Sequence, residues 1–506
     1  MRVIGPSPAL LLAALSLALI GGALLACEQP PAPVITPAES GSPVAAGAPE
    51  LVAGSSERIE NPTPVADSSQ APSLIPSQTP VAGTSSVPSA DASQAPTAIP
   101  TQMPTPLPDN RFALLLLGYG GGGHDGAYLT DAMMVLIVDP DQKTVTMLSL
   151  PRDLWVPLNF DGSQPVYNKV NTAYAFARDS RLYPQRLPRY RGDGGAGRFA
   201  KDTVAHVLGI PIDYYLALDF QAFRDLIDAV GGVDVVVPAS FTAQYPRHDS
   251  SSIDPGWMMV SFRAGPQHLN GERALQFARA REVVDNSAEG SDFARARRQR
   301  LILMALKDQL FQPSGLIHLP QVLGIVQRSA DTDYPLLGVG DLAKLALAWS
   351  EVQVYQAGLS LSNYLKHDIG SHGEYILVPR QADGSWEAVQ AFARQLRADP
   401  ALGEAMAAAP VVVVNRTGRS VVARETATHL SALGYVVTRT DAGPVQYQTV
   451  IRDRSGGRAA RLVEALSQHL GLQPAAVVLE QADRAPKVVV ELGLDALGIS
   501  SASASP

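Results

Sequence analysis

Residues 111–150 read RFALLLLGYGGGGHDGAYLTDAMMVLIVDPDQKTVTMLSL, and two apolar runs stand out in this stretch, at 111–118 and 132–139. A third strand-like segment, TVTMLSL, covers residues 144–150. Unbroken apolar runs of this length between turn residues are typical of buried strands. We therefore predict three strands, with a glycine-rich loop between the first two.

The segments that follow alternate between helical and extended patterns. Residues 197–210 and 220–232 have the spacing of amphipathic helices, whereas residues 213–219 and 233–238 have the pattern of strands. Strands that alternate with amphipathic helices predict a layered α/β domain.

The loop after the first strand has the glycine spacing of a dinucleotide-binding fingerprint, but a strand follows it where that motif needs a helix. A P-loop is excluded because no Gly-Lys-Ser/Thr ending is present. The loop presents Asp125 and Asp131, whose carboxylate oxygens suit Mg²⁺ or Mn²⁺ shared with a substrate phosphate. The neighbouring His124 is better explained as a surface residue than as a ligand.

Arginine is concentrated in the stretch LQFARAREVVDNSAEGSDFARARRQR, residues 275–300. The whole chain has a formal net charge of -8, so a local excess of arginine suggests an anionic ligand. The second half is predicted to be a helix that begins at Ser291 or Asp292. On such a helix Asp292, Arg295 and Gln299 fall along one face, and Arg298 lies beside them.

Planar guanidinium groups bind phosphate oxygens in pairs, so neighbouring arginines suit a pyrophosphate. The predicted pyrophosphate ligands of this stretch are Arg279, Arg281, Arg295, Arg298 and Gln299. In the alternative interpretation the stretch is a solvated basic face that pairs with acidic neighbours, namely Glu282, Glu289 and Asp292.

The third predicted strand ends in Pro151-Arg152-Asp153. Arg152 at a strand end is a candidate for a further phosphate ligand, and Asp153 for the group that orients it. A surface ion pair is the alternative.

The N-terminus carries an apolar run that ends in Leu24-Leu25-Ala26-Cys27, and Cys27 is the only cysteine. A short apolar run closed by small residues indicates an export signal. Residues 1–27 resemble a bacterial lipoprotein signal with Cys27 as the lipid attachment site. A retained transmembrane anchor is the alternative, because the run is near the lower limit for a span, roughly 17 residues. Either places the remainder at the outer face of the bacterial cytoplasmic membrane.

Four further segments are predicted from composition and pattern. Residues 28–108 are rich in Pro, Ser, Ala and Thr and are expected to be a disordered spacer. Residues 109–409 are expected to form the catalytic domain, with helix-like stretches and short turns after residue 311. Residues 410–495 form a small C-terminal α/β domain in this prediction, followed by a disordered tail at 496–506.

The motifs together resemble the LytR-CpsA-Psr (LCP) family of bacterial cell-envelope proteins. The matching segments follow the family order, from Asn110 to Leu310. They are Leu129–Met134, Ser149–Asp153, Lys169–Tyr174, Gly231–Val235, Ala264–Gly271 with Ala274–Leu275, Ala278–Arg281, and Asp292 with Arg295 and Arg298–Arg300. Residues 410–495 resemble the LytR C-terminal domain that often accompanies the family.

The resemblance implies a three-layer α/β/α domain with a central mixed sheet that holds a polyprenyl pyrophosphate. Family members transfer a glycopolymer with its linking phosphate from this carrier to a peptidoglycan hydroxyl. On this resemblance Asp131 helps to hold Mg²⁺, and the phosphate-binding candidates are Arg152, Arg279, Arg281, Arg295 and Arg298.

One departure concerns the metal site. Family members carry an aspartate in Gly-x-Asp after the first strand, where this chain has Gly118-Tyr119-Gly120. Asp125 is the expected replacement. Asp131 or Asp153 is the expected acceptor of the hydroxyl proton.

Three functions fit these motifs. The first is the metal-assisted phosphotransferase, with a polyprenyl-pyrophosphate-linked glycan and peptidoglycan as partners. The others are a hydrolase of the same lipid and a non-catalytic protein that binds pyrophosphate lipid or cell wall. No nucleic-acid partner is expected of an exported acidic chain.

Overall fold

The computed structural model describes residues 110–121, 126–158, 166–179, 186–247, 256–312, 314–335, 352–381, 383–440, 443–483 and 486–497. The predicted signal peptide with Cys27, the spacer at 28–108, Asp125 and residues 498–506 of the predicted tail lie outside these residues. The predicted start of the disordered tail at residue 496 was wrong, because Ala496 is only 2% exposed and lies in a 3₁₀ turn at Leu494–Leu497. No helix in the described part of the chain is both long enough and apolar enough to cross a membrane.

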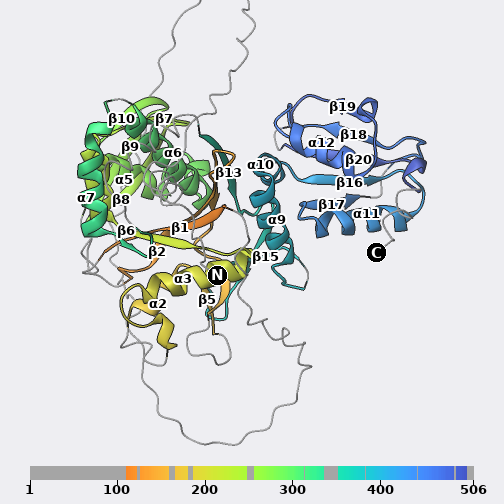
Figure 1. Cartoon of the computed structure of the whole chain (residues 1–506). Helices are drawn as coiled ribbons and strands as arrows, with labels where there is room; N and C mark the ends of the chain where they lie inside the picture. Colours follow the sequence, from red (N-terminus) through yellow and green to blue (C-terminus); the bar gives the residue numbers. More distant parts are fainter. Residues whose placement is uncertain are drawn as a thin grey trace, which may run out of the picture. The chain divides into compact units, whose positions relative to one another are not determined.

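A six-stranded mixed sheet forms the centre of the larger domain (Figure 1). Its strands, in spatial order, are β12 (Asp331–Thr332), β6 (Tyr214–Asp219), β1 (Phe112–Tyr119), β2 (Thr130–Asp139), β3 (Thr144–Ser149) and β13 (Gln353–Gly358). The pairs β1–β6 and β3–β13 are parallel, and the other neighbouring pairs are antiparallel. The three strands predicted from residues 111–150 are β1, β2 and β3.

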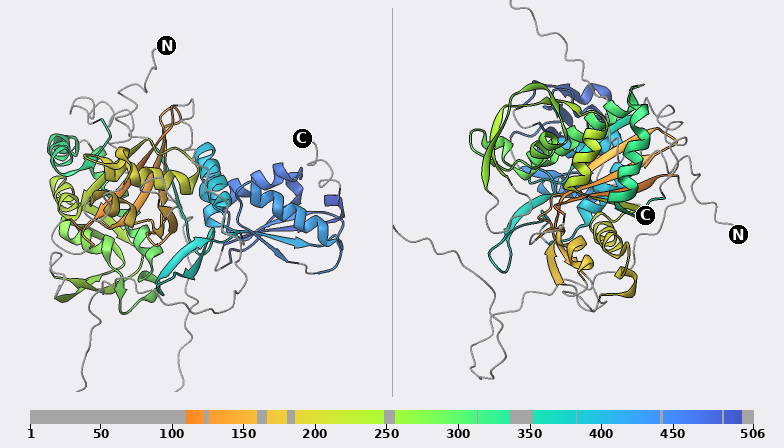
Figure 2. Two further views of the ribbon diagram at one scale, coloured as in Figure 1. Left: turned by 90° about the horizontal axis from the view of Figure 1, so that it is seen from below. Right: turned by 90° about the vertical axis from the view of Figure 1, so that its left-hand side faces the viewer.

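Helices cover both faces of this sheet (Figure 2). Successive side chains of a strand point to opposite faces, so Leu115 and Leu114 of β1 enter different cores. The Leu115 face packs against α2 (Thr172–Arg178) and α3 (Gly195–Leu208). The Leu114 face packs against four helices: α4 (Phe220–Ala229), α5 (Gly271–Arg279), α6 (Asp292–Phe311) and α7 (Leu319–Ser329). Each fully buried leucine stabilises this three-layer arrangement by about 1.5–3 kcal/mol.

Smaller ribbons extend the domain around the sheet. Between α4 and α6, β7 (Val233–Val237) pairs with β10 (Gly265–Leu269). In the same region a three-stranded sheet has the spatial order β9 (Trp257–Phe262), β8 (Phe241–Pro246) and β11 (Glu282–Val283). Two further hairpins are β4 (Trp155–Leu158) with β5 (Val166–Lys169), and β14 (Leu365–Ile369) with β15 (Tyr375–Pro379).

The prediction of helices and turns after residue 311 was incomplete. It missed β13, which completes the central sheet, and the β14–β15 hairpin. Strand β13 has only three apolar residues in QVYQAG, and β14 carries the charged sequence LKHDI, so neither has the apolar run that marked β1.

A second sheet of five strands forms the C-terminal α/β domain (Figure 1). In spatial order its strands are β17 (Val437–Thr440), β16 (Val411–Asn415), β20 (Val488–Leu492), β18 (Val450–Asp453) and β19 (Val477–Leu479). The helices of this region are α9 (Glu387–Ala398), α10 (Pro400–Ala408), α11 (Ser420–Ala432) and α12 (Ala460–His469). Helix α11 packs on β16 and β17, and α12 packs on β18.

Candidate active site

A cavity of about 340 Å³ lies between the central sheet and helices α4, α5 and α6. Its wall is mainly apolar. On one side lie apolar side chains of β1, β2 and β6 that point to the same face of the sheet as Leu114, and on the other side lie the apolar faces of the helices. The apolar lining includes Leu116, Met134, Leu218, Phe223, Leu275, Ile302 and Leu303. This shape and chemistry suit an apolar chain.

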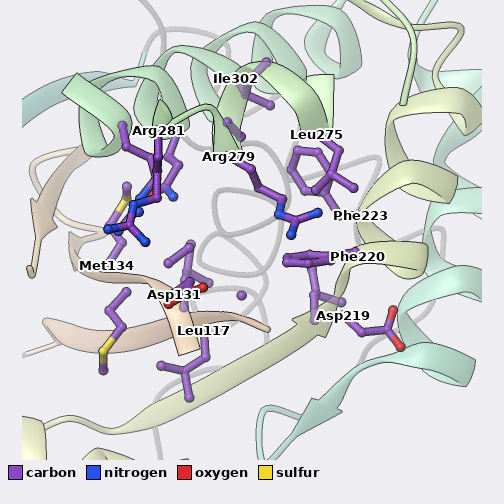
Figure 3. A pocket seen from close by; sticks show the side chains of 18 of the residues that line it. Leu117, Asp131, Met134, Asp219, Phe220, Phe223, Leu275, Arg279, Arg281 and Ile302 are labelled. Atoms are coloured by element: carbon purple, nitrogen blue, oxygen red, sulfur yellow. The ribbon is translucent and has the colours of Figure 1, made fainter. Parts of the chain in front are cut away.

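Charged side chains gather at one part of the cavity wall. The lining includes Asp131, Arg279, Arg281, Arg295 and Gln299. Figure 3 shows the guanidinium groups of Arg279 and Arg281 and the carboxylate of Asp131 extending toward the same space. An apolar cavity with clustered arginines suits an amphipathic anion.

The secondary structure explains why these residues meet. Asp131 is the second residue of β2, beside the end of β1, where the register shifts at Gly118 and Tyr119. Arg279 is the last residue of α5, and Arg295 lies in the first turn of α6. Ser291 caps α6, as predicted, because its side chain accepts a hydrogen bond from the Ala294 amide.

Arg279 is held by aromatic side chains. Its guanidinium lies 3.9 Å from the centre of the Phe220 ring, and its Nη1 donates a 2.9 Å hydrogen bond to the Tyr245 hydroxyl. Figure 3 shows the arginine over the face of Phe220. These contacts fix the orientation of the Arg279 guanidinium, and Arg279 lines the cavity at the same time.

Asp292 organises the other arginines. Its Oδ1 lies 3.0 Å from Arg295 Nη1 and 3.6 Å from Arg281 Nε, and its Oδ2 lies 3.9 Å from Arg152 Nε. The alternative interpretation is therefore correct about two of its acidic partners: Asp292 pairs with its basic neighbours, and Glu289 pairs with Arg297 and Arg298. However, these arginines are not simply a solvated face, because Arg281 and Arg295 line the cavity.

Arg152 links the two aspartates of the prediction. Its Nη1 lies 2.6 Å from Asp131 Oδ1, and its Nε lies 3.5 Å from Asp153 Oδ2. Burial opposes the charge of Arg152, but the carboxylates of Asp131, Asp153 and Asp292 outweigh it and raise its pKa. Arg152 lies on a small adjoining cavity of about 20 Å³, which Asp131, Arg295 and Gln299 share with the larger cavity.

Asp153 has a supporting position rather than a place on the larger cavity wall. Only 4% of this residue is exposed, and its Oδ1 accepts a 2.6 Å hydrogen bond from Lys169 Nζ. Burial raises the pKa of the Asp153 carboxyl, but Lys169 and Arg152 outweigh this effect and hold the pKa below its usual value. A buried, paired carboxylate of low pKa is poorly suited to accept a proton, so Asp153 orients Arg152.

The structure does not bring Arg298 to the cavity with the other predicted ligands. Its exposed fraction is 0%, and it donates to the backbone oxygens of Phe277, Ala280 and Glu289. It also pairs with the Glu289 carboxylate at 3.0 Å, and burial lowers its pKa to about 10. Helix position 298 faces the α5–α6 connection, so Arg298 fastens the segment that carries Arg279 and Arg281.

Arg295, in contrast, is both buried and on the cavity wall. Burial lowers the pKa of its guanidinium, and Asp292 partly offsets this effect. A partly desolvated guanidinium interacts more strongly with a phosphate than one in water does.

Several lining residues were missed by sequence reasoning. They are Phe220, Phe223, Tyr245 and Trp257. Phe220 and Phe223 are three residues apart on α4, a spacing that marks a shared helix face but does not reveal what the face contacts. Tyr245 and Trp257 come from β8 and β9, and no local pattern predicts their place.

The metal prediction rests on Asp131 alone within the described residues, because Asp125 lies outside them. The described residues contain no group of three or more His, Cys, Asp or Glu side chains that could hold a metal ion. Asp219 also lines the cavity, but its Oδ1 caps α4 by accepting from the Ala222 amide at 2.8 Å. Asp131 is exposed and lines the cavity, so it is the predicted residue that could hold a Mg²⁺ ion together with oxygens of a bound ligand.

Known proteins share these segments. Residues 81–383 match the LytR_cpsA_psr family, and residues 408–495 match the LytR cell envelope-related transcriptional attenuator domain. The chain is 34% identical over 227 residues to the polyisoprenyl-teichoic acid–peptidoglycan teichoic acid transferase TagV of Bacillus subtilis (strain 168), across 44% of this chain and 49% of that protein. It is 30% identical over 221 residues to the enzyme TagU of Bacillus mycoides (strain KBAB4), across 44% of this chain and 60% of that protein.

Among solved structures, the crystal structure of B. subtilis TagV resembles the chain with 26% identity and a TM-score of 0.41, over 57% of this chain and 97% of that one. In sequence, the chain spans only 49% of TagV and 60% of TagU, so it matches part of each curated relative's length. The LytR_cpsA_psr match covers most of the chain, including every residue of the cavity. The chain belongs to the LytR-CpsA-Psr family.

Proposed function

We propose that the protein is a phosphotransferase that moves a glycopolymer, with its linking phosphate, from a polyprenyl-pyrophosphate carrier to a peptidoglycan hydroxyl. One observation carries this proposal: an apolar cavity of about 340 Å³ has Arg279, Arg281 and Arg295 in its wall. A polyprenyl pyrophosphate has the matching parts, an apolar chain and a diphosphate. The names of TagV and TagU, which state transfer of teichoic acid from a polyisoprenyl carrier to peptidoglycan, support the same reaction.

The arginines supply the main chemical contribution. Phosphoryl transfer needs positive groups next to the negatively charged non-bridging oxygens and a hydroxyl in line with the bond that breaks. Positioning and electrostatics therefore dominate catalysis. Arg279 is fixed by Phe220 and Tyr245, and Arg295 by Asp292. Groups held in this way need little reorganisation when charge develops in the transition state.

Of the two carboxylates predicted as proton acceptors, Asp131 lines the cavity. We assign to Asp131 the role of accepting the proton of the attacking hydroxyl, because Asp153 is buried against Lys169 and does not line the cavity. A bound Mg²⁺ would be held by Asp131 and phosphate oxygens and would supply further positive charge to the diphosphate. Arg152 orients the Asp131 carboxylate through the 2.6 Å ion pair between its Nη1 and Asp131 Oδ1.

The location follows from the same proposal. The substrate is a membrane lipid and the acceptor is part of the cell wall, so the protein acts at the outer face of the cytoplasmic membrane. Lipidation at Cys27 would keep it there, and the spacer at 28–108 would give it reach.

The test incubates the full chain with a synthetic polyprenyl-pyrophosphate disaccharide and peptidoglycan fragments, with and without Mg²⁺, and identifies products by mass. The proposal predicts a fragment that gains a sugar phosphate only when active protein is present. Free sugar phosphate at the same rate with or without fragments would identify a hydrolase instead. Tight lipid binding without any product would leave only a binding protein.

A further inference from the structure

A separate groove of about 850 Å³ lies between α9, α11 and β17. Helix α11 contributes Arg424, Ala427, Thr428 and Ser431, whose spacing places them on one helix face. Alanine and serine leave space between the helices that larger side chains would fill. The remaining lining residues are Gln381, Glu387, Ala388, Gln390, Arg394, Ala432 and Arg439.

Three exposed arginines from three different elements converge on this groove. Arg394 comes from α9, Arg424 from α11 and Arg439 from β17. None of the three has an ion-pair partner among the described residues. Of the described residues that line the groove, Glu387 is the only carboxylate.

Several other arginines of the same region are paired with carboxylates. Arg416 pairs with Glu491 at 2.8 Å, Arg452 with Glu480 at 2.8 Å, and Arg461 with Asp399 at 2.6 Å. In the groove, by contrast, three arginines without an ion pair share one hollow of the surface. Guanidinium groups without internal partners are free to bind phosphate oxygens in pairs.

Buried contacts hold the two helices that form the groove walls. Tyr364 and Phe392 of α9 stack with ring centres 4.5 Å apart, and the Tyr364 hydroxyl donates a 2.7 Å hydrogen bond to the Gly434 oxygen after α11. Gly434 has a φ of 90°, and a Cβ there would lie 2.7 Å from the Phe392 nitrogen. Only glycine permits this close approach, so the spacing of α9 and α11 is defined by packing.

We propose that this groove binds a phosphate-bearing glycan chain. The arginines bind phosphates, and the amide and hydroxyl side chains of Gln381, Thr428 and Ser431 bind sugar hydroxyls. The volume is in the range that holds a drug-sized ligand, which is more than a single phosphate ion needs. This inference rests on the proposed function, because the chain bound here is the glycopolymer that the cavity transfers.

The test measures binding of a synthetic glycerol-phosphate oligomer to the full chain in a nonionic detergent by calorimetry. Substituting Arg394, Arg424 or Arg439 by alanine should weaken binding by about threefold to tenfold each, and the triple variant should not bind measurably. The matched control is Arg419→Ala, because Arg419 is also exposed and next to α11 but does not line the groove. It should bind the oligomer like the wild type.

Each other outcome contradicts the proposal. Equal weakening by Arg419→Ala would show a diffuse charge effect, and unchanged binding by the triple variant would show that the oligomer binds elsewhere. If polyglutamate bound as tightly as the oligomer, the groove would not select phosphate over other anions. If inorganic phosphate competed completely at an equal phosphate concentration, the groove would bind single phosphates rather than a chain. Arg279→Ala should leave this binding intact, so failure of the groove and failure of the transferase are separable.

Discussion

The replacement of Arg298 by alanine distinguishes a structural arginine from a phosphate ligand. Arg298 is completely buried, and its guanidinium donates hydrogen bonds to three backbone oxygens and the Glu289 carboxylate. Removing the Arg298 side chain leaves these buried acceptors without this donor, and breaking a buried ion pair by removing one partner costs about 3–5 kcal/mol. We expect the free energy of unfolding to fall by about 4 kcal/mol, since Arg297 still pairs with Glu289 and offsets part of the loss.

Urea unfolding followed by tryptophan fluorescence measures this change. Arg297→Ala is the matched control, because its side chain is 43% exposed and contacts the same Glu289 carboxylate. An exposed partner of this kind contributes about 0–1 kcal/mol. An Arg298→Ala variant within 1 kcal/mol of the wild type that fails to bind lipid pyrophosphate would refute the structural role.

Four further predictions concern the cavity and its supports. Arg279→Ala should lower kcat/KM by about 10²-fold, and Arg279→Lys should not restore it, because the Phe220 and Tyr245 contacts suit a planar guanidinium; steady-state kinetics with both variants checks this. Because Asp131 is assigned both the metal and the acceptor proton, Asp131→Asn should lower turnover by about 10²–10⁴-fold while lipid binding persists, and turnover close to that of the wild type would contradict this assignment. The lowered pKa of Asp153 contributes stability that is present above its unfolded pKa of about 3.9 and is lost as the pH falls through the folded value; melting temperatures from pH 6 to pH 3 should therefore fall less steeply for Asp153→Asn than for the wild type. Leu303→Trp should fill the apolar part of the cavity and raise KM for long polyprenyl chains more than for short ones, so equal effects on both chain lengths would count against the lipid site.

The central strands could be predicted because their signal is local. Strands β1 and β2 are buried and contain long apolar runs, and the buried strand β3 has β-branched and apolar residues between turn signals. Strand β13 lies at the sheet edge and β14 is largely exposed, so their sequences are mixed and read as turns or helix. Burial, rather than strand geometry itself, made the difference.

The candidate site was predictable in composition but not in geometry. The density of arginine between residues 275 and 300 predicted an anion site, and the structure places Arg279, Arg281 and Arg295 on one cavity. Helical spacing did not reveal that Arg298, one turn from Arg295, faces the protein interior. The aromatic contacts of Arg279 come from segments distant in sequence, which no local pattern connects.

The most direct test of the central claim is a crystal structure of the full chain with a polyprenyl-pyrophosphate disaccharide. We expect the diphosphate oxygens within hydrogen-bond distance of Arg279, Arg281 and Arg295, and the first isoprene units between β2 and α6. A lipid bound with its diphosphate away from these three arginines, or with its chain outside the cavity, would contradict it.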